Sequence, residues 1–270
     1  MIDIYPDYTE LFGGLRSIDD FLNLEVELVR DFKNRKTGRF EMGGEAFYIK
    51  KHFACGLWAV LDELFHLRKP HIGAGHERAA LDTLHTLGID TMTVAAFGQD
   101  GKTLTGQQSF LVTEELINIK STAKVCAEWP TQPPTAAFKK SLLRKIAAIA
   151  KKLHASGINH RDFYLCHFLL DVSKEANETV SPKLYLVDLH RAQQRASVPF
   201  RWRVKDVGGL YFSAMDIGLT RNDLFRFMRL YTGKTLRQTL SEDKRFWKAV
   251  RRRAVWTYRR DFGRSPECKI

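Results

Sequence analysis

The sequence predicts an α+β fold in which an antiparallel sheet comes first and a mainly helical region follows. Residues 24–53 alternate between apolar and polar side chains in short runs, which is the pattern of half-buried strands. From residue 139 onward the apolar side chains recur at helical spacing. A hydrophobic share of 44% and a charged share of 27% are those of a globular protein that can bury a core.

Three hairpin-linked strands are expected near the start of the chain, separated by turns that contain glycine or asparagine. They are Val26–Phe32, Arg39–Met42 and Phe47–Phe53. A helix over residues 75–87 follows, because its apolar residues share one face and Gly88 can end it. The last two strands of the sheet are expected at residues 93–97 and 109–113.

The boundary between the two regions is expected where prolines gather. Three prolines lie within Trp129–Pro134, and proline interrupts helices and strands alike. We therefore expect residues 116–137 to cross between two lobes, with 1–115 as the first lobe and 116–270 as the second. The second lobe should contain an amphipathic helix over Lys139–His154, whose apolar stripe faces a core.

Composition and spacing exclude several classes of protein. The N-terminal residues lack the basic start and apolar run of a signal peptide. The apolar stretch Leu142–Leu153 is broken by charged residues, so no membrane span is expected. The four cysteines form no Cys-x-x-Cys pair, which favours reduced thiols in a cytoplasm. The spacing of His71, His76 and His85 matches no zinc ligand set.

Positive charge is concentrated toward the C-terminus. Residues 191–270 contain 20 Lys or Arg and 7 Asp or Glu, whereas residues 1–190 contain 23 and 24. An anionic partner is therefore expected: a phospholipid surface, an acidic substrate or an acidic protein. Nucleic acid is not expected, because the basic and aromatic residues follow no known nucleic-acid-binding module.

The segment Lys244–Arg264 is the most basic part of this region, and it also has an apolar side. The apolar residues form a seam at helical spacing: Phe246, Trp247, Val250, Ala254 and Tyr258. Two interpretations stay open at this point. The helix covers the second lobe, or its basic residues hold the protein at an anionic membrane.

Two aspartates are the candidate catalytic residues. Asp162 ends the triplet His160-Arg161-Asp162, and Asp188 follows an apolar strand 26 residues later. Phosphoryl transfer from ATP uses one carboxylate to position and deprotonate the acceptor hydroxyl, and a second to hold the magnesium ion that neutralises the phosphates. Asp162 suits the first role and Asp188 the second.

A lysine and a glutamate precede the aspartates in the order found in kinases. Lys50 closes a strand, and Glu77 begins the next helix 27 residues later, where it can pair with the lysine and aim it at the ATP phosphates. Lys51 competes for this role, but neighbouring side chains of a strand point to opposite faces, so only one lysine points inward. We expect Lys50, Glu77, Asp162 and Asp188 to converge on one ATP molecule.

Several segments carry a resemblance to a known family. They are Phe47–Lys50, Glu77 with Leu87–Thr91, Val112–Leu116, Asn159–Leu170, Val187–Ala192 and Lys205–Ser213. Over most of its length the chain resembles the lipopolysaccharide core heptose(I) kinases of Gram-negative bacteria, the WaaP or RfaP family. The resemblance implies a protein-kinase-like bilobal fold and the ATP- and magnesium-dependent phosphorylation of a heptose hydroxyl of the lipopolysaccharide inner core. It also implies a location at the cytoplasmic face of the inner membrane, and it favours Lys50 over Lys51.

The likeness to kinases gives expectations for further residues. Glu115 and Leu116, at the lobe crossing, are expected to receive adenine through their backbone groups. His167 stands where protein kinases have the asparagine that holds a second magnesium, so it is a candidate metal ligand beside Asp188. Imidazole is a poor ligand for magnesium, so a hydrogen bond to Asp188 or a phosphate, or a structural role, stays open for His167. Asp206 is expected to brace the catalytic loop.

The loop that covers the phosphates in kinases is poor in glycine here. Its basic residues, Lys33, Arg35, Lys36 and Arg39, either contact phosphates by charge or belong to a solvated turn. The triplet after the strand is Asp188-Leu189-His190, without the glycine of protein kinases. This favours an enzyme that is not regulated by a flip of this loop.

Other functions remain open beside heptose phosphorylation. A Kdo or aminoglycoside kinase of similar fold would carry the same catalytic residues. A catalytically inactive kinase fold that acts as a scaffold is disfavoured, because the lysine, the glutamate and both aspartates are present.

Overall fold

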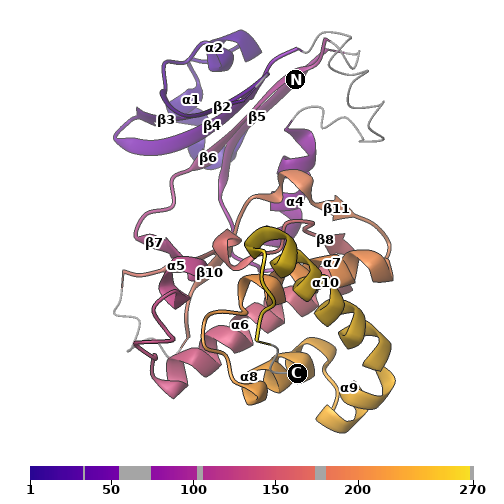
Figure 1. The fold of residues 1–270 in the computed structure, drawn as a ribbon. Coiled ribbons are helices and arrows are strands. Elements are labelled where there is room, and N and C mark those ends of the chain that lie inside the picture. Colours follow the sequence, from indigo (N-terminus) through magenta and orange to yellow (C-terminus); the bar gives the residue numbers. More distant parts are fainter. Residues whose placement is uncertain (33, 55–73, 102–105, 174–180, 268–270) are drawn as a thin grey trace. The chain divides into compact units, whose positions relative to one another are not determined.

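The computed structural model describes residues 1–32, 34–54, 74–101, 106–173 and 181–267, which form two compact units (Figure 1). The first unit comprises residues 1–83 and 92–116, and the second comprises 84–91 and 117–270. The first is built on a sheet and the second is mainly helical, so the predicted α+β class is confirmed.

The first unit is built on a six-stranded antiparallel sheet in the order β1-β5-β6-β4-β3-β2. Its strands are β1 (Ile2–Ile4), β2 (Glu27–Phe32), β3 (Arg35–Met42), β4 (Glu45–His52), β5 (Val94–Asp100) and β6 (Gln108–Glu114). All five predicted strands are confirmed, with ends that differ by a few residues. Gly43 and Gly44 form the two-residue turn between β3 and β4, with φ of +62° and +85°. Glycine suits this turn because both positions require the left-handed region.

An aromatic core lies against one face of this sheet. It is formed with the short helices η1 (Pro6–Tyr8), α1 (Thr9–Phe12) and α2 (Ile18–Leu22). The ring of Phe21 from α2 stacks on that of Phe110 from β6 with centroids 4.0 Å apart, and Phe12 meets Phe47 edge-on at 5.2 Å. All four rings are fully buried, and each contributes roughly 1.5–3 kcal/mol to stability. This core fixes one face of β4, the strand that carries the candidate lysines.

The predicted helix over residues 75–87 is confirmed as α4 (Gly75–Thr86). Gly88 follows it with a φ of +60°, the conformation that ends helices and favours glycine. Leu81 and Leu84 are fully buried on its apolar face, and Glu77 lies in its first turn.

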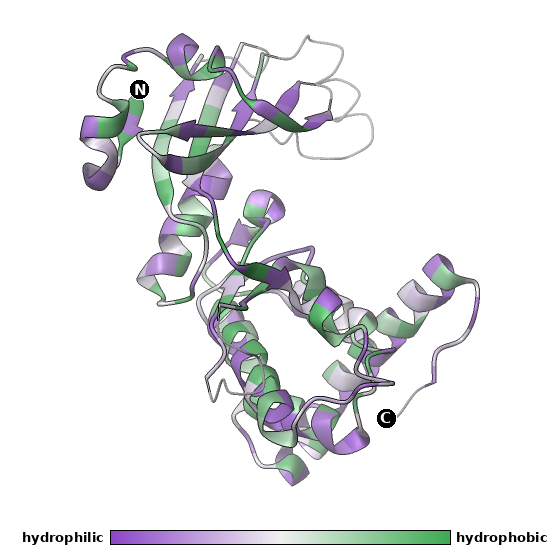
Figure 2. Cartoon of the chain, turned by 90° about the vertical axis from the view of Figure 1, so that its left-hand side faces the viewer, coloured by the Kyte–Doolittle hydropathy of each residue, from purple (hydrophilic) through white to green (hydrophobic). Residues whose placement is uncertain are grey.

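The second unit consists of six helices, two small sheets and short 3₁₀ turns within its described residues. The helices are α5 (Thr122–Cys126), α6 (Ala136–Ala155), α7 (Phe200–Ser213), α8 (Arg221–Thr232), α9 (Leu236–Glu242) and α10 (Lys244–Phe262). Figure 2 shows hydrophobic residues interspersed with hydrophilic ones along these helices, as their amphipathic sequences require. The predicted helix over 139–154 is confirmed as α6, which begins earlier because Thr135 caps it.

Within the predicted lobe crossing at residues 116–137, residues 117–137 belong to the second unit. They include β7 (Ile119–Ser121) and α5. β7 pairs with β9 (Phe168–Asp171), and β9 pairs with β10 (Leu184–Leu186). Strands of three or four residues are too short to show an alternating pattern, which is why the prolines dominated the prediction.

The apolar seam of the C-terminal region is buried within the second unit. All five predicted seam residues of α10 are buried, and α10 packs along α7. At Gly208 of α7 a Cβ would lie 2.9 Å from the Arg253 side chain, so the missing side chain permits this close approach. This burial fits the covering interpretation, one of the two that the sequence left open. No helix of the described residues is long and apolar enough to cross a membrane.

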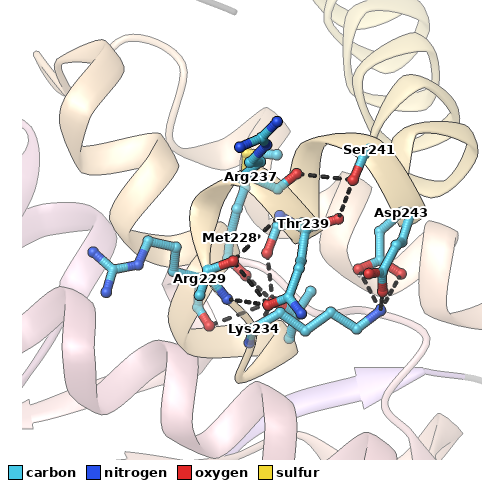
Figure 3. A network of polar contacts seen from close by, with 11 residues as sticks. Met228, Arg229, Lys234, Arg237, Thr239, Ser241 and Asp243 are labelled. Carbon is cyan, nitrogen blue, oxygen red and sulfur yellow. Dashed lines mark hydrogen bonds and ion pairs between the residues drawn. The ribbon is translucent and has the colours of Figure 1, made fainter.

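The start of α10 is held in place by polar contacts with the preceding turns (Figure 3). The ammonium of Lys234 contacts both carboxylate oxygens of Asp243, at 3.2 and 2.9 Å. The hydroxyls of Thr232 and Thr239 are 2.9 Å apart and link α8 to α9. These contacts fix the direction in which the basic side of α10 runs.

Candidate active site

The catalytic loop begins at a two-stranded ladder in the second unit. β8 (Ile158–Asn159) pairs antiparallel with β11 (Gln193–Gln194), with Asn159 opposite Gln193. Gly157 precedes the ladder with a φ of +78°, and a Cβ there would lie 1.8 Å from the carbonyl oxygen of Arg195. Only glycine allows this approach. The ladder fixes the chain just before His160-Arg161-Asp162.

Asp206 holds the loop from α7, as predicted. Its carboxylate is fully buried and accepts hydrogen bonds from the backbone N–H groups of His160 (2.7 Å) and Arg161 (2.8 Å). The His154 ring also contacts it at 3.3 Å, and the other ring nitrogen of His154 lies 2.8 Å from the Tyr231 hydroxyl. Arg161 has a φ of +74°, a conformation that costs a non-glycine residue energy and persists only where its surroundings impose it.

His160 ties the loop to the strand that leads to Asp188. Its Nε2 donates a hydrogen bond to the carbonyl oxygen of Val187 at 3.0 Å. Burial lowers the pKa of His160 below its ordinary value, so the ring is neutral and serves as a structural donor.

His167 brings Asp162 and Asp188 into one constellation. Its Nδ1 donates to the backbone carbonyl of Asp162 at 2.6 Å, and its Nε2 lies 3.2 Å from a carboxylate oxygen of Asp188. Burial by itself lowers the pKa of His167, but the Cys166 side chain, the Asp162 carbonyl and the Asp188 charge together raise it to about 9. The protonated ring is a hydrogen-bond donor to Asp188, the alternative role that the sequence had left open.

Asp188 has a left-handed backbone conformation where the strand β10 gives way to a 3₁₀ turn. Its φ of +65° places it in the left-handed region, immediately before the 3₁₀ turn η3 (Leu189–Arg191). His190, from this turn, contacts the other carboxylate oxygen of Asp188. Histidines therefore flank the carboxylate on both oxygens.

The carboxylate of Asp162 is contacted by two cations. Arg191 Nη1 donates to both oxygens at 3.0 Å, and Lys205 Nζ lies 3.9 Å from one of them. The side chain of Asp162 is 17% exposed, so it is partly accessible to a reactant.

In the first unit the predicted lysine and glutamate are paired. Lys50 from β4 forms an ion pair with Glu77 from α4, whose side chain is almost fully buried. Lys51 faces the other way, as the alternation predicts: it is buried, and its ammonium donates to the carbonyl oxygen of Leu24 at 2.6 Å. Burial lowers the pKa of Lys51, with a contribution from Lys36. Lys51 is thus committed to the core face of the sheet.

Glu115 and Leu116 end the first unit, and two contacts bear on their predicted role. The backbone N–H of Glu115 already donates to the carbonyl of Ala46 at 3.0 Å, so this group is not a donor for adenine. The Glu115 side chain is bound by Arg39 Nε at 3.0 and 3.1 Å. The Glu115 carbonyl oxygen and the Leu116 N–H remain as candidates.

The basic residues of the predicted phosphate loop are mainly engaged with acids. Arg39 also contacts Glu41 at 2.8 Å, and Lys36 pairs with Asp31 at 3.5 Å. Lys33 lies outside the described residues. Arg35, Lys36 and Arg39 lie within β3, so the interpretation as a solvated turn is wrong for these three residues. The acid contacts of Lys36 and Arg39 give no support to a phosphate site either.

Asp188 and His167 are the residues from which a magnesium site was expected. Within the described part of the chain, no group of three or more His, Cys, Asp or Glu residues is arranged to hold a metal. Magnesium, however, usually takes one or two carboxylates together with phosphate oxygens and water. Asp188 fits that requirement, whereas the imidazole of His167 is a poor ligand for a cation that prefers oxygen.

Comparison with known proteins identifies the family. A family model described as "Lipopolysaccharide kinase (Kdo/WaaP) family" matches residues 19–231, which is most of the chain. The chain belongs to this family. Its relatives include the lipopolysaccharide core heptose(I) kinase WaaP of Escherichia coli K12, 40% identical over 241 residues that cover 89% of this chain and 91% of the relative. The WaaP of Pseudomonas aeruginosa is 36% identical over 253 residues and 94% of both chains.

A solved structure agrees with the assignment to the lipopolysaccharide kinase family. It is a WaaP in complex with acyl carrier protein, with a TM-score of 0.81 and 34% identity, covering 96% of this chain and 99% of that one. The predicted protein-kinase-like fold is thereby confirmed, and this family member is a phosphotransferase.

The sequence did not single out two residues that this lipopolysaccharide kinase uses to hold its aspartates. Arg191 and His190 stand within the segment Val187–Ala192, which was noted for its resemblance. His190 was also named in the triplet Asp188-Leu189-His190, but only because that triplet lacks a glycine. Both follow Asp188 by two or three residues, a spacing at which a tight turn folds side chains back toward the first residue. The contact of His190 with Asp188 could have been predicted from this spacing. The contact between Arg191 and Asp162 spans 29 residues of sequence, and no local pattern predicts it.

Proposed function

We propose that this chain is an ATP-dependent kinase that phosphorylates a heptose hydroxyl of the lipopolysaccharide inner core. The observation that carries the proposal is the constellation of Asp162 and Asp188, joined through His167, in a chain whose relatives are heptose(I) kinases. These relatives favour heptose over Kdo or an aminoglycoside as the acceptor. The lysine, the glutamate and the two aspartates expected of an active kinase are all present, which argues against an inactive scaffold.

Asp162 is proposed as the catalytic base. Its carboxylate accepts the proton of the acceptor hydroxyl while the hydroxyl oxygen attacks the γ-phosphorus of ATP, and ADP leaves with the electron pair of the broken bond. The contacts of Asp206 with the two preceding backbone N–H groups hold the loop in the shape that presents this carboxylate. A fixed base raises the rate because its orientation is prepared before the substrate binds.

Asp188 is proposed as the magnesium ligand, with His167 and His190 holding its carboxylate in place. Magnesium, when bound, supplies positive charge to the β- and γ-phosphates. Lys50, positioned by Glu77, is proposed to contact the α- and β-phosphates. The Glu115 carbonyl oxygen and the Leu116 N–H are proposed to receive adenine.

The test is phosphorylation of a core oligosaccharide from which the heptose phosphate has been removed. After incubation with enzyme, magnesium and ATP, mass spectrometry should show the gain of one phosphate on heptose. Lys50→Met should lower this transfer by roughly a hundredfold, the loss expected when one charged donor to a phosphoryl group is removed. The matched control is Lys51→Met, which removes the neighbouring charge from the core face and should keep the activity. Transfer to Kdo alone, or equal losses in both variants, would contradict the proposal.

A basic surface on α10 is proposed to bind an anionic partner at the cytoplasmic face of the inner membrane. It consists of exposed basic residues of this helix: Lys244, Arg245, Lys248, Arg251, Arg252 and Arg259. Arg253 is excluded because it packs beside Gly208 and its guanidinium lies 5.0 Å from the Trp256 ring. With the seam buried, its apolar residues are not available for binding to a lipid surface.

The partner proposed for this surface is an acidic protein of the acyl carrier type, as in the complex of the related WaaP, with the anionic membrane as a second ligand. An apolar cavity in the same unit is lined by residues such as Leu142, Ile146, Leu210 and Met228. It offers an apolar environment for an acyl chain.

Neutralising the basic surface should weaken both interactions. We expect Lys248→Gln, Arg251→Gln and Arg252→Gln together to reduce binding to anionic liposomes and to acyl carrier protein, since each basic residue near an anionic surface contributes about 1 kcal/mol. Binding is measured by sedimentation and by titration at increasing salt, which should reduce the difference. The control removes equal charge from α8 and α9 with Arg221→Gln, Arg229→Gln and Arg237→Gln. Equal losses in both triple variants would contradict a localised surface.

A further inference from the structure

Arg191 has unused hydrogen-bonding capacity beside the catalytic carboxylate. A guanidinium carries five N–H donors, and the two on Nη1 suffice for its contacts with the oxygens of Asp162. Within the described part of the chain, this side chain hydrogen-bonds only Asp162. It is 36% exposed, so its remaining edge can receive a ligand. A planar fork of N–H groups matches the oxygens of a phosphoryl group.

The chain on both sides of a short ladder brings Arg191 near Asp162. Asn159 pairs with Gln193 and Ile158 with Gln194 in the ladder of β8 and β11. Arg191 lies two residues before β11, at the end of η3, and Asp162 lies three residues after β8. The turn η3 begins just after Asp188, the proposed magnesium ligand, and ends at Arg191. The same turn therefore positions both side chains.

The surroundings of Asp162 carry more positive than negative charge. Lys205 lies 3.9 Å from its carboxylate, and Arg161 lies close enough to act electrostatically on Lys205. Burial lowers the pKa of Lys205, Asp162 opposes this effect, and Arg191 and Arg161 add to it. The nearby acids are committed elsewhere: Asp206 to backbone N–H groups, and Asp188 to two histidines. Such an excess of cations favours an anionic ligand at this place.

We propose that Arg191, supported by Lys205, binds the γ-phosphoryl group during its transfer and is a catalytic residue of this kinase. The inference rests on the proposed function, in which Asp162 is the base. The acceptor oxygen would lie about 2.6–3.2 Å from the Asp162 carboxylate and about 3–3.5 Å from the γ-phosphorus. Only the acceptor oxygen would therefore separate the phosphoryl group from the Asp162 carboxylate. Arg191, which is bound to this carboxylate, would be close to the phosphoryl group.

The transfer forms one bond to phosphorus and breaks another. The acceptor oxygen forms a bond to the γ-phosphorus, the bond from phosphorus to the β,γ-bridging oxygen breaks, and its electron pair stays on ADP. The hydroxyl proton moves to Asp162. Negative charge on the transferred group's three outer oxygens meets the N–H groups of Arg191, an arginine supplied in cis, which elsewhere contributes a factor of about 10³–10⁵.

A rival role is that Arg191 only positions Asp162. The two roles differ in a variant without the carboxylate, because a positioning residue then has nothing to position. ADP with magnesium and aluminium fluoride mimics the planar phosphoryl group in transfer, and its binding can be measured without turnover. Titration calorimetry on the full chain thus separates the roles.

The experiment compares Arg191→Ala in the wild-type and in the Asp162→Ala background. We expect Arg191→Ala to weaken binding of the ADP–aluminium fluoride complex roughly a hundredfold in both backgrounds, with the Kd of ADP alone unchanged. In turnover, kcat should fall while the KM for ATP stays constant, and Arg191→Lys should recover part of the loss. Arg195→Ala is the matched control, because its guanidinium bonds Asn159 and Gln193 and not Asp162.

Three results would overturn the inference: no effect on aluminium fluoride binding in the Asp162→Ala background, an equal loss of ADP affinity, or an equal effect of Arg195→Ala. Failure of the proposed function is a different result. In that case Asp162→Ala would retain full transfer to the oligosaccharide, whatever the binding data for Arg191 show.

Discussion

Replacing Asp162 by alanine is expected to lower kcat for phosphate transfer by a factor of roughly 10²–10⁴, the range for loss of a positioned general base. The variant removes the carboxylate whose two oxygens accept from Arg191 Nη1. The acceptor hydroxyl would lose its proton acceptor, while Asp206 still holds the loop. The measurement is the rate of phosphate incorporation into the core oligosaccharide at saturating ATP.

Asp162→Asn separates orientation from basicity in the same assay. The amide keeps the shape of the side chain but cannot take the proton, so it should be nearly as slow as alanine. A circular dichroism spectrum and a melting temperature equal to those of the wild type would show that the loss is chemical. Turnover within a factor of two or so of the wild type in either variant would remove Asp162 from the mechanism.

Replacing Asp206 by alanine is expected to lower the free energy of unfolding of the second unit by roughly 3 kcal/mol or more. Its carboxylate is fully buried and accepts from two backbone N–H groups and the His154 ring. All three would be left without this acceptor. Urea unfolding followed by tryptophan fluorescence reports on this unit, because four of the five tryptophans lie in it: Trp129, Trp202, Trp247 and Trp256.

The matched control for Asp206→Ala is Asp216→Ala. Asp216 accepts from the Tyr258 hydroxyl at 2.7 Å but is 56% exposed, and substitutions at such positions usually change stability by about 0.5 kcal/mol or less. The Asp206 variant should also lose activity, since Arg161 would no longer be held in its strained conformation. Equal stability of the two variants would mean that the buried carboxylate does not brace the loop.

Much of the first unit could be predicted because its strands are long and half-buried. The alternation along β4 placed Lys50 and Lys51 on opposite faces before any contact was known, and the core beneath Phe47 and Ile49 decides which face Lys51 takes. The short elements, such as β7 and β11, have two or three residues and no period that a sequence pattern could reveal.

The candidate site was predictable where a motif is local and not where it depends on tertiary register. The triplet at Asp162 and the strand before Asp188 stand in the sequence as continuous signals. The cation that holds Asp162, by contrast, comes from a residue 29 positions away. The protonated state of His167 arises from neighbours that only the folded loop supplies.

Gly157 connects these observations to how such an enzyme can vary. The residue has no reactive group, yet the carbonyl of Arg195 occupies the space where any side chain would begin. A substitution there would separate β8 from β11 and so displace Arg191 from Asp162. Every chemically active side chain would remain in the sequence. Inspection of active-site motifs alone would therefore classify such an allele as intact. Its catalytic residues would be unchanged, but they would no longer be held in position.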